Sequence, residues 1–206
     1  MPSTTPRIFM VTGDAPDPAA IREAAQILRA RGLVAFPTET VYGLAADAAS
    51  PDAIERLNRV KGRPPEKPYS LHVHSIEQVA QQVGTIPPSA LRLMERFWPG
   101  PLTIILPGAS GKTVGFRLPD HPVALAFLKA CGTLVVAPSA NRSGSPPPTD
   151  AQEVRAALGD TFDCLLDAGP TKLGRESTVV ECLDGRVEIR REGAIPRQEI
   201  LSAGSA

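Results

Sequence analysis

Short apolar runs alternate with amphipathic stretches along most of this chain. Runs of four or five mainly apolar residues are typical of buried strands and occur at 8–11, 33–36, 69–73, 134–137 and 164–167. Between them, apolar residues recur at every third or fourth position, as in helices that bury one face. Such helices are predicted at 17–31, 50–61, 75–83, 88–97, 122–130 and 150–158, the last with Thr149 as its N-cap.

Two further pairs of apolar runs are predicted to form hairpins. The first joins 102–106 to 113–118, and the second joins 177–183 to 187–190 through Asp184-Gly185, a strong turn signal. Because hairpins accompany alternating strands and helices, we expect an α/β fold: a twisted mixed β-sheet with helices on its faces. We expect one domain over 8–200, with flexible termini at 1–7 and 201–206.

Composition narrows the class of protein. A chain of 206 residues is long enough for one well-buried core, and an aromatic content of 4% makes that core aliphatic. The formal net charge is zero, which argues against a general nucleic-acid binder but allows a local basic patch. Cys131, Cys164 and Cys182 lack metal-ligand spacing and are odd in number, so buried thiols are expected.

The sequence also bears on location. No apolar run approaches the ~20 residues of a membrane span, and the residues from Met1 to Arg7 lack a signal-peptide pattern. Free thiols are typical of a reducing compartment. We therefore expect a cytoplasmic protein without a membrane partner.

Two polar loops, Pro37–Leu44 and Pro138–Gly144, each follow an apolar strand-like run. Loops at strand ends are where α/β proteins bind ligands. Thr38, Glu39 and Thr40 alone would be ordinary turn residues, but Gly43 close behind them would allow the backbone to approach a ligand. In the second loop, hydroxyl and amide groups beside a glycine form either an anion-binding nest or an Asx turn.

Three cations, Lys61, Arg63 and Lys67, crowd into seven residues among prolines. They read equally well as a solvated turn at a helix C-terminus, where cations are favoured, or as a phosphate clamp. In the second case the stiff prolines would hold the charges in place. Arginine would supply a planar fork for phosphate oxygens, and lysine a compact charge.

Two polar residues interrupt predicted strands. Alternation places His72 and His74 on one face of their strand. Arg117 within an apolar strand needs an anion, which Asp120 or a substrate carboxylate would provide.

Taken together, six segments resemble the YrdC-like threonylcarbamoyl-AMP synthase family over about residues 8–197. In order they are Pro37–Leu44, Lys61–Pro64, Leu71–Val73, Arg117 with His121-Pro122, Ser139–Gly144 and Glu176–Val179. The resemblance implies a YrdC/RibB-like fold with a concave basic site. It also implies a nucleotidyltransferase that forms threonylcarbamoyl-AMP and pyrophosphate from L-threonine, bicarbonate and ATP, for N6-threonylcarbamoyl modification of tRNA adenosine. The chain ends soon after Arg191, so the short, single-domain type is expected.

The resemblance also assigns roles to individual residues. Lys61 and Arg63 would be catalytic, close to the triphosphate. Threonine would be held by Thr40, His72, Arg117, Ser139 and Ser177. ATP would be held by Arg63, Lys67, Thr113, Asn141, Thr149 and Arg191. Mg²⁺ would ride on the ATP phosphates rather than in a protein metal site, and tRNA threonylcarbamoyl-transfer proteins would receive the product.

Two other functions fit parts of the same pattern. The chain could be a paralogue that binds double-stranded RNA or tRNA without synthase activity, using a patch made of Arg59, Lys61, Arg63, Lys67, Arg190 and Arg191. It could also be a domain of the type that adenylates carbamoyl phosphate. Salt-dependent RNA affinity would support the first, and a substrate panel separates the second from a synthase.

Overall fold

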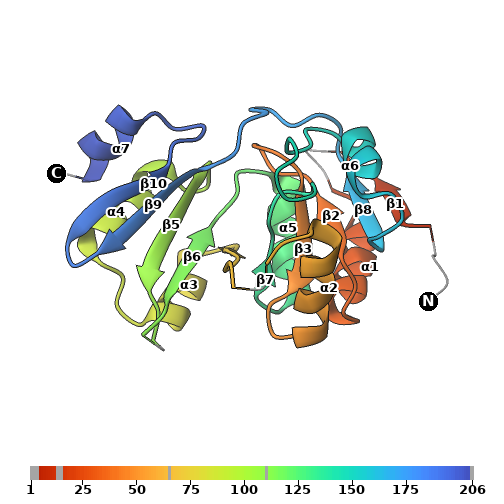
Figure 1. Ribbon diagram of the computed structural model, residues 1–206, viewed down its shortest axis with the longest axis horizontal. Helices are drawn as coiled ribbons and strands as arrows, with labels where there is room; N and C mark the ends of the chain where they lie inside the picture. The colour runs from red at the N-terminus through yellow and green to blue at the C-terminus, as the bar shows by residue number, and fades with distance from the viewer. Residues whose placement is uncertain (1–4, 13–15, 65, 110, 205–206) are drawn as a thin grey trace.

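The computed structural model describes residues 5–12, 16–64, 66–109 and 111–204, and its strands form a ten-stranded mixed sheet (Figure 1). Across the sheet the strand order is β1-β8-β2-β3-β7-β4-β6-β5-β9-β10. The pairs β1/β8, β8/β2, β4/β6 and β5/β9 are parallel and the others antiparallel. The strands are β1 (Arg7–Met10), β2 (Val34–Phe36), β3 (Gly43–Asp47), β4 (Leu71–His72), β5 (Leu102–Pro107), β6 (Thr113–Arg117), β7 (Val135–Val136), β8 (Cys164–Asp167), β9 (Thr178–Leu183) and β10 (Arg186–Arg191).

Helices cover both faces of the half formed by β1, β8, β2, β3 and β7. Residues of α1 and α5 pack against Val34 and Phe36, whereas residues of α2 and α6 share a core with the intervening Ala35. Neighbouring residues of one strand therefore face opposite helix layers, as the two-residue period of a strand requires. The helices are α1 (Pro18–Arg29), α2 (Pro51–Lys61), α3 (Ile76–Val83), α4 (Pro88–Phe97), α5 (Pro122–Cys131), α6 (Ala151–Leu158) and α7 (Arg197–Gly204).

The other half of the sheet buries one face only. Leu102, Ile104 and Leu106 of β5 share a core with residues of α3, α4 and α7, which lie along this half in Figure 1. The intervening Thr103 points the other way, into a cavity. The chain passes between the halves at three segments, 62–70, 118–121 and 168–177. Polar side chains therefore gather where these passages meet the uncovered face.

Most of the predicted elements are confirmed. Helix α4 has the predicted bounds, and both hairpins form. Asp184 and Gly185 have φ angles of 50° and 75°, as a tight hairpin turn with two left-handed residues requires. The mixed α/β architecture is also confirmed.

Several details differ from the prediction. Strand β3 lies where the first polar loop was expected to continue, and α7 was not predicted. The N-cap of α6 is Asp150 rather than Thr149, since the Asp150 carboxylate accepts the Glu153 N–H at 2.8 Å. Of the expected flexible termini, residues 1–4 and 205–206 lie outside the described residues, but β1 begins at Arg7 and α7 extends to Gly204.

The three cysteines are free and buried, as predicted. Burial raises the pKa of the Cys131 and Cys164 thiols to about 12 and that of Cys182 to about 11. Thiols with such pKa values are poor nucleophiles at neutral pH, so they act as small apolar residues. Among the described residues, no helix has the length and apolar character needed to cross a membrane.

A buried hydroxyl at the start of β9 generates a stability prediction. Thr178 Oγ1 donates to the Ile195 carbonyl (2.7 Å) and accepts the N–H groups of Gly193 (2.9 Å) and Ile195 (3.0 Å). Replacement Thr178→Val keeps the shape but leaves these three groups unpaired. We expect a loss of about 2–4 kcal/mol in the free energy of unfolding, measured by urea denaturation. The exposed-hydroxyl control Ser202→Ala should lose less than about 0.5 kcal/mol, and equal losses in both variants would contradict this account.

Candidate substrate site between the two halves of the sheet

A cavity of about 520 Å³ opens where the three passages between the halves meet. Among the residues described, its lining includes five cationic side chains and one carboxylate, that of Glu176. The predicted site residues that line it are Lys61, Arg63, Lys67, His72, Arg117, Ser139, Asn141, Ser177 and Arg191. Cations therefore outnumber carboxylates in its lining, and most of the residues singled out in the sequence converge on it.

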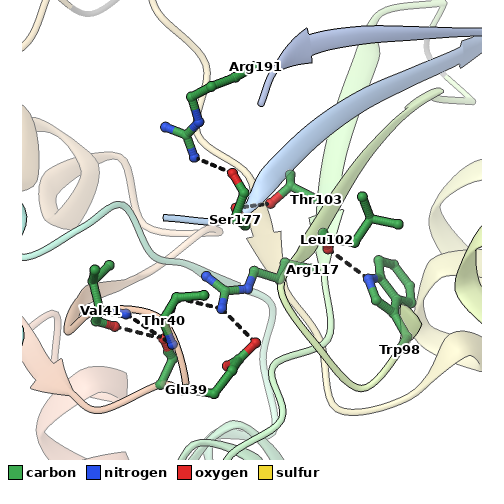
Figure 2. Close-up of polar contacts among 10 residues, drawn as sticks. Glu39, Thr40, Val41, Trp98, Leu102, Thr103, Arg117, Ser177 and Arg191 are labelled. Atoms are coloured by element: carbon green, nitrogen blue, oxygen red, sulfur yellow. Dashed lines mark hydrogen bonds and ion pairs between the residues drawn. The ribbon is translucent and has the colours of Figure 1, made fainter. Parts of the chain in front are cut away.

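The floor of the cavity follows from strand register. His72 of β4 pairs with Arg117 of β6, which pairs with Thr103 of β5, and Thr103 pairs with Val179 of β9. Directly paired residues project from the same face of a sheet, so these four side chains form a row across four neighbouring strands. Ser177 joins the row just before β9, with its hydroxyl 2.9 Å from that of Thr103 (Figure 2).

Arg117 is the central residue of this floor. Its Nη2 donates to Glu39 Oε1 at 2.9 Å and to Thr40 Oγ1 at 2.6 Å, as Figure 2 shows. Both members of the ion pair are buried, with side-chain exposures of 7% for Arg117 and 5% for Glu39. The prediction that Asp120 pairs with Arg117 was wrong. Asp120 is exposed in the turn after β6, whereas Arg117 is part of the cavity floor. Thr40 does not line the cavity but supports Arg117 from behind.

The first polar loop is a compact hydroxyl turn. Thr38 Oγ1 donates to the Val41 carbonyl at 2.7 Å and accepts the N–H groups of Thr40 and Val41 at 3.2 and 3.3 Å. With its proton committed to Val41, Thr38 accepts from the Thr40 hydroxyl at 2.8 Å. The lone pairs of Thr40 are thereby left for Arg117. The turn thus fixes Thr40 as an acceptor for Arg117, behind the cavity floor.

The second polar loop lies directly against the first. The Ala140 N–H donates to the Tyr42 carbonyl at 2.8 Å, and Ser139 forms a β-bridge with Gly43. Gly43 was expected to admit a ligand, but it belongs to β3, and a Cβ there would come within 3.0 Å of the Phe36 ring. Its small size therefore serves packing between neighbouring strands rather than ligand approach.

Lys61 ends α2 and binds the second loop. Its Nζ donates to the carbonyls of Ser139 (2.5 Å) and Asn141 (2.6 Å). Burial and the neighbouring Arg63 lower the pKa of Lys61 to about 8, although Glu176 opposes this shift. Lys61 is thus partly committed to the backbone of the second loop, and it also lines the cavity, as predicted.

Arg63 is held in place by its own turn. Its Nη2 donates to the Pro68 carbonyl at 2.9 Å, and its guanidinium carbon lies 4.8 Å from the centre of the Tyr69 ring. On the facing wall, Arg191 donates to Glu176 Oε1 and to the Ser177 carbonyl, both at 3.0 Å. These cations are therefore pre-ordered around the cavity, which reduces the entropy lost when a ligand binds.

Besides Thr40, two predicted residues are not part of the cavity lining. Thr113 is exposed and begins β6, at the opposite end of that strand from Arg117. The Thr149 hydroxyl donates to Glu153 Oε2 at 2.9 Å beside the start of α6.

Conversely, the predicted set of site residues omitted Thr103 and Glu39. Thr103 was detectable as a lone polar residue within an apolar strand, and Glu39 as the acid of the Thr-Glu-Thr turn.

His72 is neutral at physiological pH. Burial, reinforced by the adjacent Arg117 charge, lowers the pKa of His72 to about 3, and a backbone contact with Ser70 offsets this only in part. Its Nδ1 has no hydrogen-bond partner within the described parts of the chain, and the same holds for Arg117 Nε and Asn141 Oδ1. Buried polar atoms without partners are rare in native proteins, and these three belong to residues that line the cavity.

Comparison with known proteins identifies the family of this chain. Residues 26–193 match the Sua5_yciO_yrdC family model, described as "Telomere recombination". The chain belongs to the Sua5/YciO/YrdC family. The solved structure of P. abyssi Sua5 complexed with L-threonine superposes with a TM-score of 0.90 and 38% identity, covering 95% of this chain and 60% of that one. E. coli YciO gives a TM-score of 0.82 and 27% identity, with 92% and 96% covered.

Curated relatives in the Sua5/YciO/YrdC family carry the name threonylcarbamoyl-AMP synthase. One from Bacillus subtilis (strain 168) is 44% identical, with 87% of this chain and 55% of the relative covered. One from Halorhodospira halophila (strain DSM 244 / SL1) is 35% identical, with 82% and 92% covered. This chain spans about half the length of the first relative and nearly all of the second. The predicted family and fold are both confirmed.

The neutral state of His72 predicts a pH dependence of stability. Its ordinary pKa is 6.5 and its folded pKa is about 3, so the unfolded chain binds one more proton between these values. Stability should therefore fall as pH drops below about 6.5, with a slope of up to about 1.4 kcal/mol per pH unit from this residue. In His72→Gln that contribution disappears. The slope of the unfolding free energy against pH between pH 4 and 6 should therefore decrease by the amount that corresponds to about one bound proton. An unchanged slope in the variant would contradict the buried, neutral imidazole.

Proposed function

We propose that this protein is a threonylcarbamoyl-AMP synthase, a nucleotidyltransferase that uses L-threonine, bicarbonate and ATP. The observation that carries this proposal is the division of one cavity into two kinds of surface. Its floor offers the buried guanidinium of Arg117 beside hydroxyls, which suits an amino acid. Its walls carry Arg63, Lys67 and Arg191, called the outer cations below, which suit a triphosphate. The names of the relatives and the threonine complex of P. abyssi Sua5 support the same reading.

Threonine fits the floor. The carboxylate would bind Arg117, whose Nε has no partner within the described residues, and charge-assisted bonds of this kind are strong. The hydroxyls of Ser177 and Ser139 and the neutral imidazole of His72 would contact the rest of the amino acid. A neutral His72 adds no charge beside the threonine ammonium, so it does not repel the substrate there.

ATP fits the walls and the second polar loop. Arg63, Lys67 and Arg191 would hold the phosphates, with Asn141 and the glycine-bearing 138–144 loop contributing polar groups. Lys61 would stabilise negative charge through the N–H that its two carbonyl bonds leave free. No group of three or more His, Cys, Asp or Glu side chains able to hold a metal occurs among the described residues. Mg²⁺ carried on the phosphate oxygens would neutralise part of the triphosphate charge.

The reaction needs no covalent bond to the protein. The threonine ammonium first loses a proton to solvent, and the resulting amine and bicarbonate form a carbamate with loss of water. A carbamate oxygen then displaces pyrophosphate from the α-phosphorus of ATP. The protein supplies proximity and fixed positive charge, two general sources of such catalysis. The product would then pass to proteins that transfer the threonylcarbamoyl group to tRNA in the cytoplasm.

The direct test is mass spectrometry of the nucleotide product. Incubation with threonine, bicarbonate, ATP and Mg²⁺ should yield threonylcarbamoyl-AMP together with pyrophosphate. Release of pyrophosphate that does not depend on threonine would count against a synthase. Replacement of threonine and bicarbonate by carbamoyl phosphate should give no adenylate, which separates this activity from the carbamoyl-adenylating type.

The cations Arg63 and Lys61 in the cavity lining are expected to have a large effect on the rate of the reaction. Arg63→Ala and Lys61→Ala should each lose on the order of 10²–10³ in kcat/KM for ATP, as when a preorganised charge-stabilising donor is removed. Arg155→Ala, at an exposed position of α6 outside the cavity lining, is the matched control and should retain full activity. Turnover at the level of the unsubstituted protein in both cavity variants would refute the clamp.

An RNA-binding paralogue without synthase activity remains the alternative function. The surface favours it less, because Arg59 is paired with Glu55 and Arg190 with Glu181 and Glu188. Phosphate-driven RNA binding would weaken steeply with salt. RNA affinity at low salt in a protein that forms no adenylate would favour this alternative over the synthase.

A further inference from the structure

Glu39 is the least expected member of this site. Its carboxylate is buried and bonded to Arg117, yet it is absent from the cavity lining. In Figure 2, Glu39 and Ser177 lie on opposite sides of the Arg117 guanidinium. The Glu39 side chain thus acts on the cavity through Arg117 rather than by lining it.

The contact between the two side chains leaves binding capacity unused. Glu39 Oε1 and Thr40 Oγ1 both accept from Nη2, so one corner of the guanidinium is anchored. Arg117 Nε and Glu39 Oε2 have no partner among the described residues. A two-bond fork between arginine and carboxylate would occupy more of these donors. The single-corner contact instead fixes the guanidinium and leaves its Nε without a partner in the described residues.

Glu39 itself is fixed at both ends. The Thr38 turn holds its backbone on one side, and its carbonyl accepts the Leu173 N–H at 2.8 Å. Leu173 belongs to the passage that leads to Ser177. Glu39 therefore ties together the first polar loop, Arg117 and the segment that supplies the facing hydroxyl.

The electrostatic consequence concerns how the cavity sorts anions. A cavity with five cations attracts any polyanion, including inorganic phosphate and the pyrophosphate product. Of these cations, the buried Arg117 has a buried carboxylate against it, whereas Arg191 shares a partly exposed pair with Glu176 at the rim. Compensation at the floor lowers the attraction that a multiply charged phosphate feels there. A single carboxylate with good geometry loses less by this compensation.

We propose that Glu39 is a positioning and specificity-determining residue that reserves Arg117 for the carboxylate of the amino acid. It directs phosphate groups to the outer cations Arg63, Lys67 and Arg191. This inference rests on the proposed function and deepens it, because it explains how one basic cavity keeps its two substrates apart.

The test compares two variants that remove the same charge from different places. Glu39→Gln keeps an oxygen that accepts from Arg117 but removes the charge at the floor. Glu176→Gln removes one charge at the rim and is the matched control. Isothermal titration calorimetry measures the binding of L-threonine with and without inorganic phosphate as the competing anion, and the binding of a non-hydrolysable ATP analogue under the same conditions.

The expected results differ between the variants. In the unsubstituted protein, phosphate should weaken binding of the ATP analogue but not of threonine. In Glu39→Gln, phosphate should compete with threonine, and the selectivity for threonine over phosphate should fall about tenfold or more, the lower end of the coupling measured for close charge pairs. In Glu176→Gln, phosphate should compete only with the ATP analogue. Competition with threonine already in the unsubstituted protein, or equal behaviour of the two variants, would overturn the proposal.

Further measurements separate this inference from a folding defect and from the proposed function. Thermal melting and ATP-analogue binding report whether Glu39→Gln is folded. If that variant is not folded, the phosphate competition measured in the unsubstituted protein decides the proposal. If threonine fails to bind the unsubstituted protein, the proposed function fails first. In that case the role of Glu39 is tested by phosphate binding alone. Glu39→Gln should gain a phosphate site, and that site should disappear in the double variant Glu39→Gln/Arg117→Gln. Without that gain, the proposal is wrong.

Discussion

A positive charge buried at the end of a strand is the constraint around which this site is built. Arg117 is nearly inaccessible to solvent, and such a charge is tolerated only when it is paired and hydrogen-bonded. Glu39 and Thr40 meet that requirement from a loop far away in the sequence. Removing Glu39 altogether would leave the guanidinium uncompensated, whereas its presence on one corner leaves Nε without a protein partner in the described residues. The same contact therefore serves the fold and prepares the site.

The sheet topology brings the remaining groups to this charge. Four neighbouring strands place His72, Arg117, Thr103 and Val179 in register on the face that helices do not cover. The passages between the two halves then add the outer cations and the hydroxyl loops. Because each passage is tied down by backbone or side-chain hydrogen bonds, the cavity is pre-ordered before a ligand arrives. Preorganisation of this kind suits a reaction that depends on placing three substrates together.

Local sequence signals predicted the parts of this fold that local physics controls. The α4 helix was delimited by prolines near both ends, and the Asp184-Gly185 turn specified its hairpin. Strand β3 was hidden because its first residues follow a hydroxyl turn and include Gly43, and α7 was hidden because Ile200 is its one fully buried residue. Asp150 and Thr149 are adjacent capping candidates, and sequence alone did not rank them.

The candidate site was predictable as a set of residues but not as a set of contacts. Most of the chosen residues reach one cavity, since polar groups at strand ends share an edge of the sheet. The partner of Arg117 could not be read from its neighbourhood, because Glu39 is 78 positions away and the nearby Asp120 points to solvent. Thr113 lies outside the cavity because it begins β6, whereas Arg117, which lines the cavity, ends that strand.

We expect one cavity to hold an amino acid on Arg117 and a nucleotide on the outer cations at the same time. The decisive measurement is a crystal structure of the protein with L-threonine and a non-hydrolysable ATP analogue. The threonine carboxylate should lie on Arg117, and the phosphates should lie against Arg63, Lys67 and Arg191. Phosphate groups seated on Arg117, or threonine bound outside this cavity, would contradict it.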